Sequence, residues 1–430
     1  MKRPGSGLIW ICTVAVLAGV VIGFVGGAFR WCLQIADHWR VDLVTWAHDL
    51  PGPGWLVPIA ATAIGATLAA VVVRWVPLAA GSGIQHVEAV YRGAARPPSL
   101  LLLPAKFIGG VLAIGSGLVL GREGPTVHMG AAIGAHAARR AGLDDRDVRM
   151  MQTALGGAGL AVAFNAPIGG ALFTLEEATK SVHLRTVLAT LFSAAAAVAC
   201  ARLILGDQPD FQVDPVPAPS TVVIPVFIVF GLITGGLGAL YSRLVLWFLD
   251  GVAAVPRIPA IGKAAVIGAV IGLLAFVDPR AVGGGDALTQ LIVGGGALAL
   301  PMALGYLVVR LVAGPLSYAA AVPGGLFAPL LAVGALWGLL FVGGLNTVLP
   351  DGNSSLVVPM AIVGMAAFFG AVVRAPVTAI VLVMEMTATT SLVVPMLAAT
   401  AAAVLAAELL RSPPIYDSLR ARMPVQRLDP

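Results

Sequence analysis

Long apolar segments with few polar positions recur along the whole chain. They begin near Leu8, Trp55, Leu100, Val187, Thr221, Ile261, Pro301, Leu326, Leu356 and Leu392. About 20 apolar residues are enough for a helix to cross the hydrocarbon core of a bilayer. Because such segments fill most of the chain, the pattern predicts an all-α polytopic membrane protein.

Glycine and proline interrupt many of these apolar segments. The chain has 52 glycines and 30 prolines, and most of them lie inside the apolar regions. In membranes these residues are typical of helices that are broken, re-entrant or packed through small side chains. The sequence therefore predicts many broken and re-entrant helices, as in a transporter or a channel.

The composition and charge agree with a membrane location. Hydrophobic residues make up 59% of the chain, and the formal net charge is +5. Basic residues gather at the two ends: Lys2, Arg3, Arg420, Arg422 and Arg427. Positive residues favour the cytoplasmic side, so we expect a multi-pass protein of the plasma membrane (the cell inner membrane) with both termini in the cytoplasm. The basic termini explain the net charge without a nucleic-acid partner.

The second half of the chain repeats landmarks of the first half in the same order. The matches have offsets of 202, 204 and 209 residues: 81–83 with 283–285, 121–125 with 325–329, and Pro167 and Glu176 with Pro376 and Glu385. Repeated halves with interrupted helices predict a transporter whose substrate site lies between the repeats. We expect one transmembrane domain (1–430) with these parts: a first inverted repeat (8–206), an outward-facing acidic linker (207–219), a second inverted repeat (220–410), and a C-terminal helix and cytoplasmic tail (411–430).

Residues 121–125, Gly-Arg-Glu-Gly-Pro, place two charges at the start of an apolar helix. Ionised groups at membrane depth are costly and indicate function. Gly124 lets the backbone unwind, and the free amides of a helix start attract anions. Glu123 is itself a tethered anion that can occupy such a site and leave it. The alternative is a capping carboxylate paired with Arg122.

Three glycine-punctuated helix starts, 81–85, 121–125 and 325–329, resemble the CLC family of chloride channels and chloride/proton antiporters. The stretch 164–167 with Glu176 and Glu177, and the stretch 414–416, extend the resemblance over nearly the whole chain. The resemblance implies a CLC-type inverted-repeat fold and a homodimer in membrane lipid with one anion pathway in each subunit. It also implies exchange of chloride for protons without a cofactor or a metal.

The resemblance also implies an anion site built from Ser82, Tyr416, Leu326, Phe327, Arg122 and Gly124. The hydroxyls of the first two and the amides of the next two would contact the anion. Neutral donors suit chloride, since a fixed full charge in low dielectric would bind it too tightly for release. Without the resemblance, Ser82 would be a helix cap and Tyr416 an interfacial residue. In the family, serine at position 82 goes with chloride preference, proline with nitrate preference, and other residues with fluoride export.

Two glutamates are candidates for proton coupling. Glu123 matches the gating glutamate of the family, which occupies an anion site when ionised and leaves it when protonated. Glu177 matches the inner glutamate that antiporters use to pass protons from the cytoplasm. For Glu176 we expect a solvated helix end with Lys180 as its surface partner.

Other polar residues near the site receive structural interpretations. Glu88 and Lys106 match a buried ion pair of the family, which we interpret as structural. Gln85 stands where relatives usually have proline, so it adds polar groups near the inner mouth. His86 is interpreted as a polar helix residue, with a role as proton donor as the alternative.

Two other functions stay open at this point. A passive chloride channel of the same family would share the anion site, although Glu177 argues against it. An intramembrane serine hydrolase would use Ser82 with His86 one turn later as its base. The hydrolase would leave the repeat unexplained, so we expect a transporter and not an enzyme.

Overall fold

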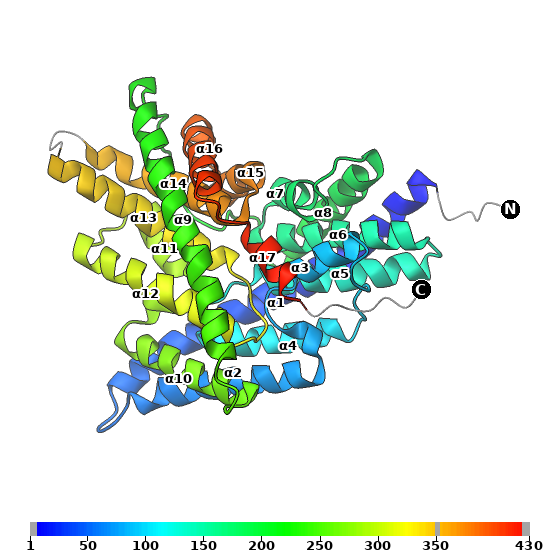
Figure 1. Cartoon of the computed structure of the whole chain (residues 1–430), viewed down its shortest axis with the longest axis horizontal. Coiled ribbons are helices and arrows are strands. Elements are labelled where there is room, and N and C mark those ends of the chain that lie inside the picture. Colours follow the sequence, from blue (N-terminus) through cyan, green and yellow to red (C-terminus); the bar gives the residue numbers. More distant parts are fainter. Residues whose placement is uncertain (1–6, 349–352, 424–430) are drawn as a thin grey trace.

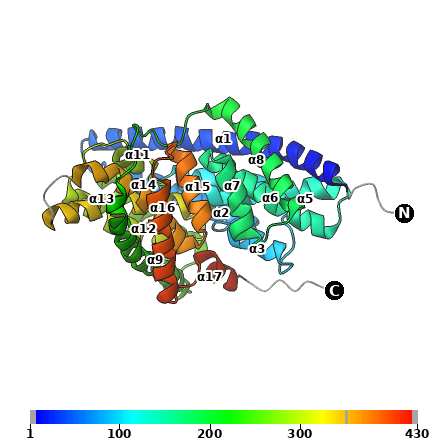
Figure 2. The same cartoon turned by 90° about the horizontal axis from the view of Figure 1, so that it is seen from above.

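The computed structural model describes residues 7–348 and 353–423, and in this part of the chain every regular element is helical (Figures 1 and 2). The helices of the first half are α1 (Leu8–His48), α2 (Leu56–Trp75), α3 (Ile84–Tyr91), α4 (Leu102–Gly115), α5 (Glu123–Arg140), α6 (Asp145–Phe164), α7 (Pro167–Phe173) and α8 (Leu184–Leu205). Those of the second half are α9 (Ile224–Ala253), α10 (Ala260–Val277), α11 (Asp286–Val293), α12 (Leu300–Ala319), α13 (Phe327–Val348), α14 (Val357–Val373), α15 (Pro376–Thr387), α16 (Val393–Leu409) and α17 (Ile415–Ala421).

Short turns of helix complete the list of elements. They are the 3-10 turns η2 (Pro77–Ala79), η4 (Thr221–Val223), η5 (Pro279–Ala281) and η6 (Asn353–Leu356), and the π-helical turn η3 (Thr174–Ala178). The basic residues Lys2, Arg3 and Arg427, on which the expected orientation partly rests, lie outside the described residues.

Seven of the described helices are long and apolar enough to cross a membrane. They are α1, α2, α8, α9 (with η4), α10, α12 and α13. The other three predicted segments form shorter apolar helices, α4, α14 and α16. Backbone breaks limit them: α14, for example, ends at Arg374, whose φ of 70° is left-handed and which precedes Ala375-Pro376. Broken helices are therefore part of the fold, as predicted.

The two halves carry the same series of elements. The series from α2 through η2 to α8 recurs as the series from α10 through η5 to α16. Figure 1 shows α5 to α8 on one side of the molecule and α11 to α13 on the other. The helix α1 runs along one long side in Figure 2. The fold is the predicted inverted-repeat helical fold, while the exact repeat boundaries, 8–206 and 220–410, stay a prediction.

Small residues allow the central helices to pack closely. Every residue of α14 except its first two is buried. Gly334 of α13 and Gly364 of α14 lie so close that a Cβ on either would collide with the carbonyl of the other. Large apolar side chains such as Ile64, Val266 and Leu405 are instead exposed on the outer faces. This distribution fits a protein surrounded by lipid.

Candidate functional site

Three helix N-termini meet at the centre of the molecule, because the loops that precede α3, α5 and α13 bond to one another. Gly121 and Gly325 exchange two backbone hydrogen bonds, each 2.8 Å long. Gly81 donates to Val322 O at 3.1 Å and accepts from Gly324 N at 3.2 Å. The landmarks matched by sequence at an offset of 204 residues are therefore in direct contact. The positive ends of several helices point to one place, which favours an anion there.

The Glu123 carboxylate occupies this place. Its side chain is fully buried, and its Oε1 accepts the amide hydrogen of Phe327 at an N–O distance of 2.6 Å. Its Oε2 has no hydrogen-bond partner among the described residues. A Cβ added to Gly121 or Gly325 would collide with the carboxylate, so only glycine fits on either side. The bound carboxylate demonstrates that an anion can be held here by a backbone amide.

Ser82 and Tyr416 contribute two buried hydroxyls beside the carboxylate. Both residues are fully buried, and neither hydroxyl has a hydrogen-bond partner within the described chain. The Tyr416 hydroxyl lies near that of Ser82 and within electrostatic range of the Glu123 carboxylate. Its ring packs edge-on against Phe327 with a centroid distance of 5.5 Å. Hydroxyl groups can donate hydrogen bonds to an anion, so the two buried hydroxyls provide candidate donors beside Glu123.

Gly124 and Leu326 shape the same place. A Cβ on Gly124 would lie 2.5 Å from Ser82 Oγ, so an alanine there would displace the serine. Leu326 is fully buried immediately before Phe327, at the start of α13. The structure thus brings together five predicted anion-site residues with Glu123.

The contacts of Arg122 differ from those expected of a residue that attracts anions. Its Nη2 pairs with Asp210 at 2.8 Å, and its Nη1 pairs with Asp286 at 3.1 Å. Its Nε donates to Ala163 O at 2.8 Å. Because two aspartates neutralise the guanidinium, its charge is not free to attract an anion. The linker was predicted only to be acidic and outward-facing, and the contact of its Asp210 with Arg122 was not predicted.

Glu177 lies on the π-helical turn η3 and is buried with 1% exposure. A π-helical turn is rare and frequent at functional sites. The carboxyl of Glu177 is close to that of Glu88, and its Oε1 has no hydrogen-bond partner among the described residues. Tyr416 is within electrostatic range of Glu177 as well as Glu123. The two candidate proton-coupling glutamates therefore both lie near Tyr416.

The predicted ion pair between Glu88 and Lys106 is wrong. Glu88 pairs with Arg420 of α17. Lys106 instead donates to the carbonyls of Gly81 at 2.6 Å and Ser82 at 3.2 Å, so it holds the serine loop in place. The short helix α17 brings Arg420 against α3, a contact between residues 332 positions apart. Sequence reasoning could not find a partner that only this packing brings near.

The predicted surface role of Glu176 is also wrong. Its carboxylate accepts the amides of Val377 and Thr378 at 3.0 and 2.6 Å, at the start of α15. Lys180 pairs with Asp417 at 3.3 Å instead. Partial burial of Asp417 favours its protonated form, but Lys180 and Arg420 outweigh this and lower its pKa. Because Glu176 lies in the first half and accepts amides of α15 in the second half, it connects the two halves of the chain.

His86 is buried and forms a hydrogen bond with His128, at 3.1 Å between Nδ1 and Nε2. It therefore does not sit at an exposed cytoplasmic mouth. The Ser82 hydroxyl has no hydrogen-bond partner in the described residues, so the serine lacks the base that a hydrolase needs. This geometry argues against the hydrolase alternative.

Two cavities are lined by glycines of the loops that carry the site, one by Gly81 and the other by Gly121. The first, which we call the Gly81 cavity, measures about 310 Å³ and is lined by Gly81, Gln85, Tyr318 and Arg422, among others. The second, the Arg122 cleft, is a notch of about 20 Å³ lined by Asp37, Gly121, Arg122, Asp286 and Ala328, among others. The cleft shares Asp37 and Asp286 with a larger, half-open cavity of about 730 Å³.

Comparison with known proteins identifies the family. Residues 64–408 match the voltage-gated chloride channel family. The chain belongs to the CLC family. It is 34% identical to the H(+)/Cl(-) exchange transporter ClcA of Vibrio parahaemolyticus, over 97% of this chain and 91% of that protein. It is 35% identical to the ClcA of Vibrio cholerae, over 98% of this chain and 90% of that protein.

Solved CLC structures share the fold. The crystal structure of a slow cyanobacterial Cl-/H+ antiporter has a TM-score of 0.90 and 27% identity, and covers 96% of this chain and 97% of that one. A CLC-type fluoride/proton antiporter has a TM-score of 0.77 at 21% identity, covering 95% of this chain and 97% of that one. At that identity the second comparison supports the fold alone. This CLC protein therefore has the fold that the sequence predicted.

Proposed function

We propose that this CLC protein is a secondary active antiporter that exchanges chloride for protons. The observation that carries the proposal is the Glu123 carboxylate, which sits among helix N-termini and hydroxyls on the amide of Phe327. A carboxylate and a chloride cannot occupy that place together. Protonation would remove the charge that holds the carboxylate there, and chloride would then take its place. The exchanger names of the Vibrio relatives support the same function.

The anion would be held by the Ser82 and Tyr416 hydroxyls and the amides of Leu326 and Phe327, with Gly124 leaving room for it. These donors are neutral, so they would bind chloride without the strong retention that a lysine in low dielectric would cause. Arg122 would act on the site only indirectly, because its charge is already paired. Protons would reach Glu123 from Glu177, whose buried carboxyl lies close to that of Glu88.

The proposal extends to assembly and location. We propose a homodimer in the plasma membrane, the inner membrane of the cell, with both termini in the cytoplasm. Exposed apolar side chains on α7, α8, α15 and α16, such as Ile168, Phe192, Val377 and Leu397, offer a face for a second copy or for lipid. The Gly81 cavity would then be the inner access route and the Arg122 cleft the outer one. Transport, rather than enzymatic catalysis, is the activity that these features support.

The passive channel is the second candidate. It shares the whole anion site and differs in having no use for Glu177. Purified protein in chloride-loaded liposomes tests the two, with a chloride electrode and a pH electrode recording together. An antiporter should move protons uphill when only a chloride gradient is imposed. Chloride flux without any proton movement would instead make the protein a channel.

A further inference from the structure

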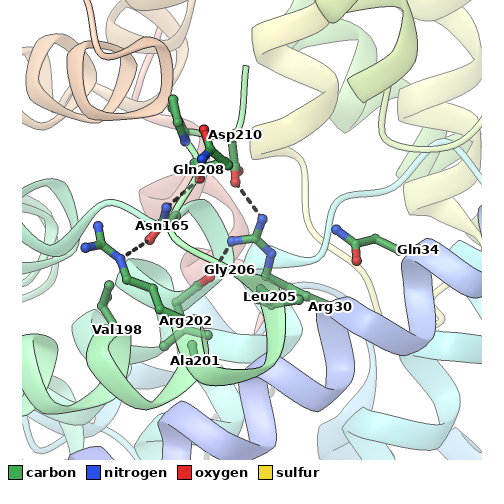
Figure 3. A pocket seen from close by; sticks show the side chains of 12 residues that line it. Arg30, Gln34, Asn165, Val198, Ala201, Arg202, Leu205, Gly206, Gln208 and Asp210 are labelled. Atoms are coloured by element: carbon green, nitrogen blue, oxygen red, sulfur yellow. Dashed lines mark hydrogen bonds and ion pairs between the residues drawn. The ribbon is translucent and has the colours of Figure 1, made fainter. Parts of the chain in front are cut away.

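The linker between the two halves (207–219) is anchored to both of them. Phe211 is buried and donates its amide to Met386 O at 2.9 Å. Gln212 exchanges two hydrogen bonds with Gln290 of α11, each 2.8 Å long. On the preceding side, Asn165 donates to Gln208 O at 2.8 Å (Figure 3). Asp210 is therefore held between fixed neighbours.

Asp210 points inward from this anchored segment. Its side chain is 3% exposed, and each of its oxygens pairs with a different arginine. Oδ1 lies 2.5 Å from Arg30 Nη2, the contact drawn in Figure 3. Oδ2 lies 2.8 Å from Arg122 Nη2. Burying a carboxylate is costly unless it is paired, so this position is a specific one.

The guanidinium of Arg122 is fully engaged away from its neighbour Glu123. All three of its nitrogens have acceptors, on α6, on the linker and on α11. Its Cζ also lies 6.0 Å from the centre of the Phe164 ring. Among the described residues Arg122 has ion pairs with Asp210 and Asp286, and Glu123 is not one of its partners. Arg122 and Glu123 therefore attract each other only through space, without an ion pair between them in the described residues.

We propose that Asp210 is a positioning residue for proton coupling. Its ion pair with Arg122 keeps the guanidinium from pairing with Glu123, so that Glu123 can leave the anion site only as the protonated acid. The inference rests on the proposed gating by Glu123. Arg122 lines the cleft next to Gly121, which is where an outward-swung Glu123 would lie. A free guanidinium there would pair with the ionised carboxylate and hold the site open without a proton. By pairing with Arg122 from its place in the linker, Asp210 prevents Glu123 from leaving the site in its ionised form.

Other charged groups near Arg122 also influence how strongly its guanidinium can attract an ionised Glu123. They are Glu123 on its own helix, Asp210 on the linker, Asp286 on α11, and Arg30 and Asp37 on α1. Asp286 pairs with Nη1 and is 38% exposed, whereas Asp210 pairs with Nη2 and is buried. Since screening by water weakens exposed ion pairs, the ion pair of Arg122 with the buried Asp210 should be stronger than its ion pair with Asp286.

The substitution Asp210→Asn tests the proposal in liposomes. It removes the anionic partner of Nη2 and leaves Arg122 able to pair with an ionised, outward Glu123. We expect the chloride flux that remains at alkaline pH to rise several-fold. We also expect the protons moved per chloride to fall to about half or less, because an opposite charge nearby favours the ionised carboxylate. The matched control is Asp207→Asn, since Asp207 lies in the same linker, is exposed and pairs with Arg202 at 2.7 Å.

A double variant separates positioning from general damage. If Asp210 acts through Arg122, Asp210→Asn combined with Arg122→Gln should recover the coupling and pH profile of Arg122→Gln alone. Wild-type coupling in Asp210→Asn, or a double variant as uncoupled as Asp210→Asn, would overturn the proposal. Should Asp210→Asn fail to give monodisperse protein, Arg30→Gln with Asp210→Asn removes the matching buried charge and carries the same expectation.

Glu123→Gln, measured in the same liposomes, distinguishes a failure of the proposed gating by Glu123 from a failure of the proposed role of Asp210. Continued proton pumping by that variant would contradict the proposed function itself. Loss of pumping in Glu123→Gln together with unchanged coupling in Asp210→Asn would contradict only the role of Asp210.

Discussion

Glu176 and Glu385 each cap the first turn of a helix in the other half of the chain. The Glu176 carboxylate accepts two amides of α15 at 2.6 and 3.0 Å. The Glu385 carboxylate accepts two amides of α7 at 2.7 and 3.1 Å. The two glutamates are 209 residues apart, as are the prolines that begin the two helices. Carboxylates at helix N-termini are stabilising, so this reciprocal contact holds the two repeats together near Glu177.

Removing either capping charge should destabilise the protein. Glu176→Gln and Glu385→Gln should each cost about 1–3 kcal/mol of unfolding free energy, since each weakens two charge-assisted hydrogen bonds. Unfolding of the purified protein in detergent, followed with increasing denaturant, measures this. Glu408→Gln is the control, because Glu408 is 76% exposed in its pair with Arg374. Two variants as stable as that control would show that the caps contribute little.

The gating role of Glu123 has a direct test. Glu123→Gln resembles the protonated acid and removes both the charge and the exchangeable proton. Chloride flux should therefore persist, lose its pH dependence and no longer move protons. Paired chloride and pH electrodes on proteoliposomes give both quantities. A variant that still drives protons uphill on a chloride gradient would show that the coupling carboxylate is elsewhere.

The neutral donors around Ser82 predict the ion selectivity. Chloride and bromide should be carried readily and fluoride poorly, because the dehydration cost of fluoride exceeds what such donors repay. Ser82→Pro should shift preference toward nitrate, since it removes the hydroxyl from the site. Relative fluxes of the four anions in proteoliposomes measure this. Faster fluoride than chloride in the unmodified protein would exclude this description of the site, and unchanged fluxes in Ser82→Pro would assign selectivity to neighbours such as Gln85.

Local sequence patterns predicted where one part of the candidate site begins. The glycine-flanked motif 121–125 predicted a helix start that attracts anions, with Glu123 and Gly124 in it, whereas Phe327 was assigned through the resemblance to the CLC family. The repeat also predicted that 121–125 and 325–329 correspond. Their direct backbone contact, through Gly121 and Gly325, was found only in the structure.

Contacts between distant segments could not be predicted. Arg420 reaches Glu88 only because α17 folds back against α3. Asp210 meets Arg122 only because the linker crosses the ends of both halves. No sequence periodicity connects residues so far apart, and for each charged side chain the sequence contains several residues of opposite charge that could pair with it. For that reason the pairing of Glu88 and of Arg122 had to come from the structure.

The last prediction separates an antiporter from a channel, and it rests on Glu177. This carboxyl is buried on the π-helical turn η3, close to the carboxyl of Glu88. A buried carboxyl beside another carboxyl can take up and release a proton without binding chloride. Glu177→Gln keeps the shape and removes the titratable proton. We therefore expect it to abolish proton transport while a substantial chloride flux remains.

Glu408→Gln serves again as the control for Glu177→Gln, because Glu176 has a capping role and is not a neutral neighbour. Chloride and pH electrodes should record both fluxes from the same liposomes, so that a fall in protein activity lowers the two together while a lost proton route lowers only one. Full coupling in Glu177→Gln would place the inner proton route elsewhere, with the buried pair of His86 and His128 as the next candidate. Equal loss of chloride and proton transport would instead give Glu177 a structural role, because a proton relay has no reason to stop chloride.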